Sequence, residues 1–183
     1  MPQILQRITL ESFIRNRNTL AEWLYPPEIA ETMGWKQAAW GKGLGRVQLL
    51  QKVLGLVEEK IRTEPDNYLP HWITDSESGH ILGMAEIRLH EKIPHVADIG
   101  MVVAKTQRGR GTGSEALRQL IEVCGQMGIE HILTSSINPV MQRLFARAGF
   151  KPLNSPEGQE LLALLGKSTG ENAPSQYFLS LKR

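Results

Sequence analysis

The sequence has few of the features that mark secreted, membrane-bound or nucleic-acid-binding proteins. It has one cysteine, Cys124, among 183 residues, so no disulfide can form within the chain and we expect a cytoplasmic protein. No apolar run approaches the roughly 18 residues of a membrane span, and no secretion signal is expected at the N-terminus. The formal net charge of +2 gives no reason to expect a membrane or a nucleic acid as partner.

The first third of the chain has a helical pattern, apart from a short strand expected at residues 4–8. One predicted helix has the inward residues Leu10, Phe13, Ile14, Ala21 and Leu24. A second, PPEIAETMGWKQAAW at 26–40, has Ile29, Met33 and Trp40. After the glycine-rich linker 41–45, a third has Val47, Leu50, Leu54, Val57 and Ile61.

The remaining chain contains strands first and then alternating strands and helices. Strands are predicted at 69–74, 80–90, 95–104, 131–137, 150–153 and 176–181, and helices after residue 113, at 139–149 and at 157–166. The helix after residue 113 is expected to bury Leu117, Leu120, Ile121, Cys124 and Met127. This order predicts an α/β fold with one mixed sheet, parallel in its middle and antiparallel at its ends. The length fits a single domain, residues 1–183.

The stretch QRGRGTGSEAL, residues 107–117, puts three glycines and two arginines directly before a helical pattern. Glycines let a backbone adopt positive φ and approach a ligand closely, and a helix N-terminus offers free N–H groups to an anion. A separate Walker A candidate, Gly166, Lys167 and Ser168, is rejected because Leu161 stands where its first glycine belongs. The stretch therefore predicts another kind of phosphate site.

A dinucleotide site is one alternative. Gly111, Gly113 and Ala116 satisfy the fingerprint G-x-G-x-x-[GA], which would favour an oxidoreductase. That fingerprint requires an acidic residue about 20 residues later, at the end of the next strand. The strand predicted at 131–137 ends in Ser135, Ser136 and Ile137, followed by Asn138, and none of these is acidic. This disfavours the dinucleotide alternative.

Two motifs resemble the acetyl-CoA-dependent N-acyltransferases of the GNAT superfamily. Arg108-x-x-Gly111-x-Gly113 matches the loop [RQ]-x-x-G-x-[GA] of that family. Farther along, the family pattern N-x(5)-L-[YF]-x-x-x-G-F is matched by Asn138, Leu144, Phe145, Gly149 and Phe150. The resemblance covers about residues 80–155, with strands and helices expected in the right order.

The resemblance implies a GNAT-like fold, whose fourth and fifth strands splay apart around the pantetheine arm of acetyl-CoA. The loop would bind the pyrophosphate, the end of the fourth strand would pair with the arm, and Asn138 would reach it from the other side. Asn138 is also suited to cap the helix that begins at Pro139. The implied cofactor-binding residues are Met101, Val102, Val103, Arg108, Gly109, Arg110, Gly111, Thr112, Gly113, Ser114, Asn138 and Phe145.

The implied activity is transfer of an acetyl group from acetyl-CoA to a primary amine of a small molecule or a protein. The reaction needs a general base, and the family's position for it corresponds to Asp98, with Glu86 on the preceding strand as second choice. Phe145 stands where the family usually has a tyrosine that protonates the thiolate. Another donor would then serve: Tyr177, Tyr68, Ser136 or water.

Several alternatives remain open at the level of sequence. The departure at Phe145 also fits a degenerate GNAT domain that binds acetyl-CoA as a regulatory module. No metal is expected, since His90 and His95 flank a turn without nearby partners. The early helices, up to about residue 65, would border the acceptor site, where Trp23, Trp35 and Trp40 either line it or pack in the core. The acceptor and the oligomeric state, a homodimer included, are left open.

Overall fold

The computed structural model describes residues 3–26, 43–91, 93–165 and 176–181. Within these residues seven strands form one sheet, in the order β1-β2-β3-β4-β5-β7-β6. The strands are β1 Gln3–Arg7, β2 Tyr68–Asp75, β3 Ile81–Leu89, β4 Val96–Val103, β5 His131–Ser135, β6 Lys151–Pro152 and β7 Gln176–Ser180. β4 and β5 pair in parallel, and every other neighbouring pair of these described strands is antiparallel. The predicted mixed sheet is confirmed.

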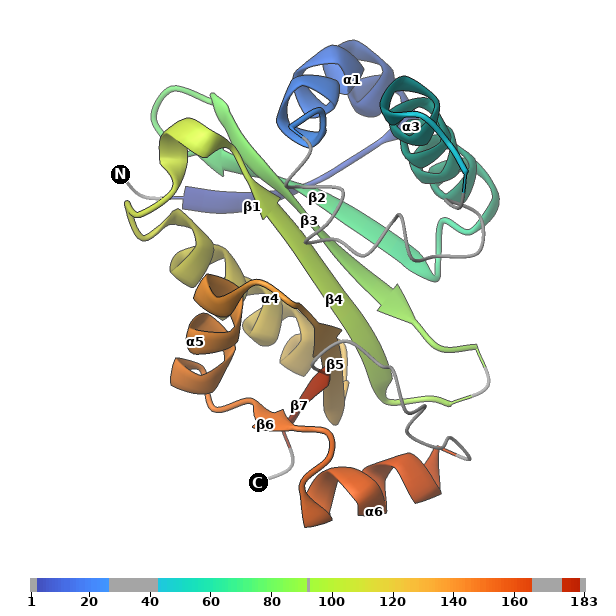
Figure 1. Ribbon diagram of the computed structural model, residues 1–183, viewed down its shortest axis with the longest axis vertical. Helices are drawn as coiled ribbons and strands as arrows, with labels where there is room; N and C mark the ends of the chain where they lie inside the picture. Colours follow the sequence, from blue (N-terminus) through green and yellow to red (C-terminus); the bar gives the residue numbers. More distant parts are fainter. Residues whose placement is uncertain (1–2, 27–42, 92, 166–175, 182–183) are drawn as a thin grey trace.

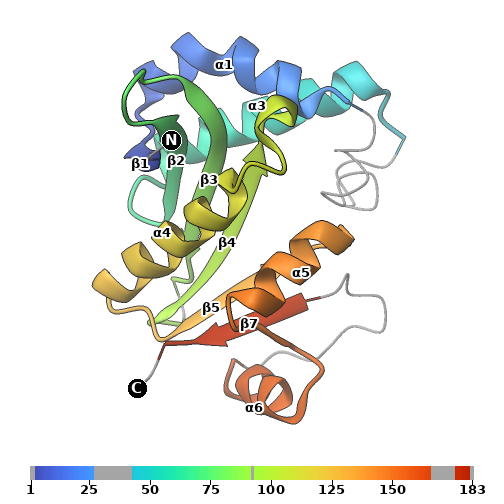
Figure 2. The same ribbon diagram turned by 90° about the vertical axis from the view of Figure 1, so that its left-hand side faces the viewer.

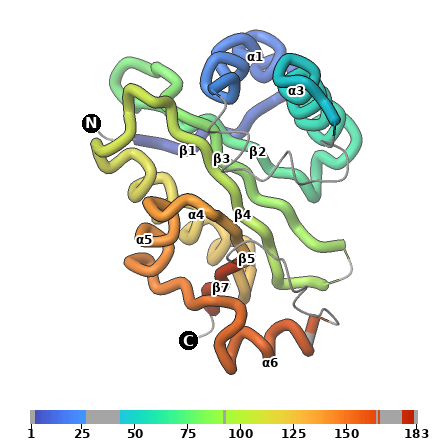
Figure 3. Tube along the Cα trace, viewed as in Figure 1, coloured from blue at the N-terminus to red at the C-terminus, as the bar shows by residue number. Residues whose placement is uncertain are grey.

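The helices cover both faces of this sheet. They are α1 Leu10–Leu24, α3 Arg46–Thr63, α4 Thr112–Gln126, α5 Pro139–Arg147 and α6 Pro156–Leu164, with a 3-10 turn η1 at Lys105–Gln107. Figure 1 shows α1 and α3 on one side of the sheet and α4 and α5 on the other. Figure 3 shows α1 and α3 side by side, at the opposite end of the molecule from α6. No helix in the described part of the chain combines the length and apolarity of a membrane span.

Side-chain caps start three of these helices. Thr9 accepts a hydrogen bond from the backbone N–H of Ser12 at the start of α1. Asn138 and Ser155 cap α5 and α6 in the same way, and a proline follows each of them at the first helical position. A side-chain oxygen satisfies one of the free N–H groups of the first turn, and proline has no N–H there to leave unpaired. These starts depend on short-range sequence, and the cap at Asn138 was predicted from it.

Each face of the sheet has its own hydrophobic core. Under α4 and α5 the core includes the fully buried Ile87, Leu120 and Ile132. Under α1 and α3 it includes Phe13 and Trp72, and the indole N–H of Trp72 donates to the hydroxyl of Ser12. A third, smaller cluster lies under α6. Two cores on one sheet explain why the strands β2 and β3 are apolar on both faces.

Three residues predicted to face inward are exposed instead. Ile14, Val47 and Met127 have 57%, 55% and 41% of their surface exposed. Ile14 follows the fully buried Phe13 and lies about 100° farther around α1, on the side away from the core. Val47 lies in the first turn of α3, and Met127 follows the last turn of α4. The predicted helix with Ile29, Met33 and Trp40 has these residues outside the described part of the chain.

Candidate active site

β4 and β5 are paired over only part of their length. Their register runs from Val96 opposite His131 to Asp98 opposite Leu133 and ends there. The Thr134 hydroxyl donates a hydrogen bond of 3.1 Å to the carbonyl of Ile99 at the point of separation. Figure 2 shows the two strands starting side by side and then diverging. Among the described strands, residues 99–103 of β4 pair only with β3, which leaves a backbone edge suited to an extended ligand arm.

The loop between β4 and α4 needs glycine for its backbone conformation. Gly109 and Gly111 have φ angles of 75° and 87°, in the left-handed region that side chains with a Cβ rarely adopt. A Cβ on either would meet no atom within 4 Å, so crowding is not the reason for glycine. Gly111 is the N-cap of α4 and both loop glycines are exposed. The loop therefore presents open space in front of the free N–H groups of a 15-residue helix, and this arrangement fits a phosphate group.

The side chains around this loop differ in what they can do for an anion. Arg108 is exposed and donates through Nε to the carbonyl of Val103, at 3.2 Å, so that it connects the loop to the end of β4. Arg110 and Ser114 are exposed. Thr112 is buried, and its hydroxyl accepts a hydrogen bond from the Gln3 side chain. Because this hydroxyl is buried, the group of Thr112 suited to contact a phosphate is its backbone N–H, in the first turn of α4.

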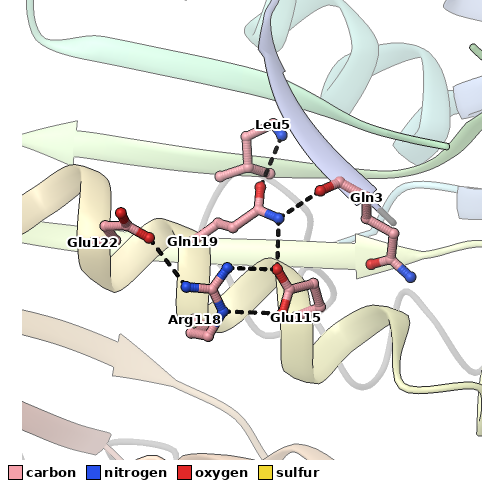
Figure 4. A network of polar contacts seen from close by, with 6 residues as sticks. All are labelled: Gln3, Leu5, Glu115, Arg118, Gln119 and Glu122. Carbon is pink, nitrogen blue, oxygen red and sulfur yellow. Dashed lines mark hydrogen bonds and ion pairs between the residues drawn. The ribbon is translucent and has the colours of Figure 1, made fainter. Parts of the chain in front are cut away.

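Gln119 attaches α4 to the edge strand β1. Its side-chain amide accepts from the N–H of Leu5 at 3.0 Å and donates to the carbonyl of Gln3 at 2.6 Å, as a neighbouring strand would (Figure 4). The same amide donates to Glu115. The pKa of Glu115 is lowered to about 2, mainly by the hydrogen bonds that it accepts from Arg118. The side chain thus satisfies an exposed sheet edge and holds α4, with the loop before it, against the sheet.

A pocket of about 160 Å³ lies on the opposite face of the sheet, between α1, α3 and strands β2 to β4. Its walls are mainly aliphatic side chains, and its floor includes residues 100–102 of β4, next to the separation from β5. Three charged residues line it: Lys60, Glu86 and Arg88. The pocket therefore joins the unpaired edge of β4 to a carboxylate in apolar surroundings.

Glu86 has a well-defined position in this pocket. The Tyr68 hydroxyl donates a hydrogen bond of 2.7 Å to its Oε2, and Nε of Arg88 lies 3.4 Å from its Oε1. Burial, and then the neighbouring Glu86, raise the pKa of Tyr68, so its hydroxyl remains a donor at neutral pH. Gly100 stands opposite Glu86 on β4, and a Cβ there would lie 3.0 Å from Oε1. The carboxylate therefore lies over the backbone of β4.

Asp98, the first choice for the base, lies on the same face of the sheet but does not line the pocket. It belongs to the paired part of β4, opposite Leu133, and its side chain is 34% exposed. Its Oδ2 is 2.9 Å from Nε2 of His90, a buried nitrogen without a hydrogen-bond partner among the described residues. The second choice, Glu86, is the carboxylate that the fold brings to the pocket.

Asn138 and Phe145 have clear structural roles in α5. The Asn138 side-chain oxygen accepts from the N–H of Val140 at 2.9 Å, which confirms the helix cap expected from the sequence. Phe145 is 3% exposed, and its ring centroid lies 5.5 Å from that of Phe150 and 5.6 Å from that of Tyr177. Tyr177 stands on β7 opposite Thr134 of β5. Of the four proton donors considered, Tyr177 thus contacts the ring that replaces the family's tyrosine.

Other candidates from the sequence belong to the core or lie outside the described residues. Cys124 is fully buried, and burial raises its pKa to about 12, as expected for a core thiol. Trp23 packs beside the core under α1 and α3, whereas Trp35 and Trp40 are not among the described residues. Within the described residues, no three His, Cys, Asp or Glu side chains group as metal ligands would.

No pattern in the sequence connects Glu86 with Tyr68, Lys60 and Arg88. Part of the signal was present, because alternate residues of a strand share a face and Met84, Glu86 and Arg88 are alternate residues. The missing part was the sheet register, which brings Tyr68 of β2 opposite Arg88 of β3. The packing of α3 then adds Lys60 to the pocket. Both depend on contacts between distant parts of the chain.

The splayed parallel strands, the glycine loop and the helix after it define an N-acyltransferase type of fold. Residues 52–150, more than half of the chain, match the family model described as the acetyltransferase (GNAT) family. The protein therefore belongs to the GNAT acetyltransferases and is an enzyme of the acyltransferase class. The sequence has no significant match among curated proteins.

Solved structures of several acetyltransferases have the same fold. The aminoglycoside acetyltransferase AAC(6')-Ib in complex with coenzyme A has a TM-score of 0.64 at 19% identity, over 98% of this chain and 95% of its own. Spermidine N-acetyltransferase from Vibrio cholerae, in complex with CoA and spermine, has a TM-score of 0.68 at 10% identity, over 97% and 95%. A GNAT acetyltransferase from Staphylococcus aureus Mu50 has 0.62 at 14%, over 99% and 100%. At such identities the likeness shows the fold alone.

Proposed function

We propose that the protein transfers the acetyl group of acetyl-CoA to a primary amine held in the pocket beside Glu86. In this proposal the whole chain is one acetyltransferase domain, and α1 and α3 border the acceptor site. The observation that carries the proposal is that the Glu86 carboxylate and the unpaired part of β4 line the same pocket. The base and the thioester must come together in such a place.

Acetyl-CoA would be bound by backbone groups of the loop and of β4. The N–H groups of residues 108–114 hold its pyrophosphate, with Arg108 and Arg110 nearby to add positive charge. Residues 101–103 pair with its pantetheine arm as a strand would. Support for this arrangement is the open space in front of Gly109 and Gly111 and the lack of a β5 partner beyond Asp98.

The proposed chemistry assigns the base to Glu86. Glu86 takes a proton from the amine, directly or through a water, while the amine nitrogen bonds to the acetyl carbon. Backbone N–H groups beside the strand separation stabilise the oxyanion, and the carbon–sulfur bond then breaks. The CoA thiolate leaves without a dedicated acid, since a thiol has an unperturbed pKa near 8.5, or takes its proton from Tyr177 or water.

Two variants decide between the candidate bases. Glu86→Gln should lower kcat/KM for an amine by about 10²- to 10⁴-fold, and Asp98→Asn should lower it much less. The measurement is release of CoA over a panel of amines, with stabilisation by CoA in thermal unfolding as the control for intact cofactor binding. A large loss for Asp98→Asn with a small loss for Glu86→Gln would return the role to Asp98.

A degenerate domain that only binds acetyl-CoA, the alternative raised by Phe145, is disfavoured because the chain belongs to the acetyltransferases and has a carboxylate at the pocket. It predicts stabilisation by acetyl-CoA and by free CoA, but no release of CoA with any amine. Stabilisation by NAD without stabilisation by CoA would contradict both candidates and support a dinucleotide enzyme.

A further inference from the structure

We propose that the acceptor is a small amine with a single positive charge, whose apolar group is about the size of one ring or a five-carbon chain. This inference rests on the proposed function and names the class of substrate for the same pocket. It differs from what the similar structures bind, since aminoglycosides and spermine carry several amino groups.

The volume of the pocket indicates the size of the apolar group that it can enclose. Its volume is about 160 Å³. Pockets for larger ligands usually have about 300–1,000 Å³, whereas an engineered apolar cavity of about 150 Å³ binds benzene. A single ring or a short alkyl chain therefore fills this volume.

The walls favour an apolar group. Leu20 and Leu24 come from α1, Val53 and Val57 from α3, and Met84 from β3. Apolar surface removed from water contributes roughly 25 cal/mol per Å², so an alkyl or aromatic group gains affinity here. A charged group placed against the same walls would lose its hydration without a partner.

The charges of the pocket oppose a second ammonium group. Glu86 is its one carboxylate among the described lining residues, whereas Lys60 and Arg88 are both cations. Glu64, which forms an ion pair of 2.9 Å with Lys60, is not one of the described lining residues. One amino group can therefore bind at Glu86, and a second one would face aliphatic side chains or like charges.

The amino group and the apolar group then have fixed places. Glu86 lies over Gly100, beside the edge of β4 where the acetyl group would lie, so the reacting nitrogen belongs at this end. The rest of the acceptor extends toward α1 and α3. In this orientation, a second positive charge at the far end of the acceptor would lower kcat/KM, because it would lie against the aliphatic walls.

A matched pair of amines tests the inference. Pentylamine and 1,5-diaminopentane have the same chain length and differ only in the second, charged end. With acetyl-CoA and wild-type enzyme, we expect kcat/KM for CoA release to be at least tenfold higher with pentylamine, and spermidine and kanamycin to be poorer still. Equal or faster release with the diamine, spermidine or kanamycin would overturn the inference and leave the proposed function standing. No release with any amine would overturn the proposed function, and this inference with it.

A pair of valine variants on the same helix tests the location. Val57→Phe reduces the pocket and should raise the KM for pentylamine at least tenfold, with less effect on ethylamine. Val47→Phe, on the exposed surface of α3 outside the pocket, is the control and should change neither KM. Both proteins should be stabilised by CoA as the wild type is. An unchanged KM for pentylamine in folded, CoA-binding Val57→Phe would show that the acceptor binds elsewhere.

Discussion

Glu86 and Gly100 stand opposite each other on β3 and β4, and the absence of a side chain at Gly100 leaves room for the Glu86 carboxylate above the strand. A Cβ at this position would lie 3.0 Å from Oε1 and 3.3 Å from Cγ of Glu86, both at tight contact. The carboxylate is further held by Tyr68 on one oxygen and approached by Arg88 on the other. Small changes around it should therefore be measurable in the reaction rate.

Gly100→Ala should lower kcat about tenfold, because the new methyl group displaces the Glu86 carboxylate by a few tenths of an ångström from its position for proton transfer. Stability should change little. Gly55→Ala is a control within α3, where a Cβ meets nothing within 4 Å. It should stabilise the helix by up to about 1 kcal/mol and leave kcat unchanged. Wild-type kcat in Gly100→Ala would contradict a role for the position of Glu86.

Tyr68→Phe should leave Glu86 in the pocket without its hydrogen-bond donor. Hydrogen bonds to charged groups contribute about 1.5–3 kcal/mol, so we expect a loss of stability of about that size in denaturant unfolding. The loss in kcat/KM should be smaller than that of Glu86→Gln, since the carboxylate itself remains. A loss as large as that of Glu86→Gln would instead indicate that the Tyr68 hydroxyl takes part in the reaction.

Gly111→Val should abolish stabilisation by CoA, since valine strains the φ of 87° and its branched side chain occupies the space in front of α4. At about 100 times its Kd, CoA should stabilise the wild type by roughly 2.7 kcal/mol in thermal unfolding. Gly79→Val is the matched control, because Gly79 also has a positive φ and open space but lies in the turn between β2 and β3. This control should lose stability and keep its response to CoA.

His71 should make stability depend on pH. Burial, and then the charge of Arg7, lower its pKa from 6.5 to about 4 in the folded protein. The unfolded chain therefore binds a proton more readily, and the contribution of neutral His71 is complete above pH 6.5 and is lost as pH falls from 6.5 toward 4. A shift of this size corresponds to about 3 kcal/mol. In urea unfolding, His71→Leu should lose less stability than the wild type between pH 7 and pH 4.5; equal losses would contradict this prediction.

Phe145 can be tested with two substitutions. Phe145→Ala should lower stability by about 3–5 kcal/mol, because a ring that is 3% exposed leaves a cavity between Phe150 and Tyr177. Phe145→Tyr should keep the fold and keep or raise kcat by supplying a hydroxyl where the family has one. Inactivity of a folded, CoA-binding Phe145→Tyr would show that the ring packs against substrate instead of lying beside the sulfur.

Much of the fold follows from short-range sequence. The alternation of strands and helices, the cap at Asn138 and the loop around Gly111 depend on neighbouring residues, and each was predicted. The caps at Thr9 and Ser155 are equally local but were not predicted. The exposure of Ile14 and Val47 was not, because periodicity shows an apolar stripe but not where its partner elements end.

By itself, the sequence determined a mixed α/β sheet and a glycine loop with left-handed φ values at Gly109 and Gly111, because such φ values and helix starts are local properties of the chain. Only the tertiary structure decided which carboxylate meets the pocket. The register of β3 against β4 puts Glu86 over Gly100, and the packing of α1 and α3 encloses it, whereas Asp98 stays in the paired part of the sheet. Pairing and packing join residues far apart in the chain, and no local pattern specifies them.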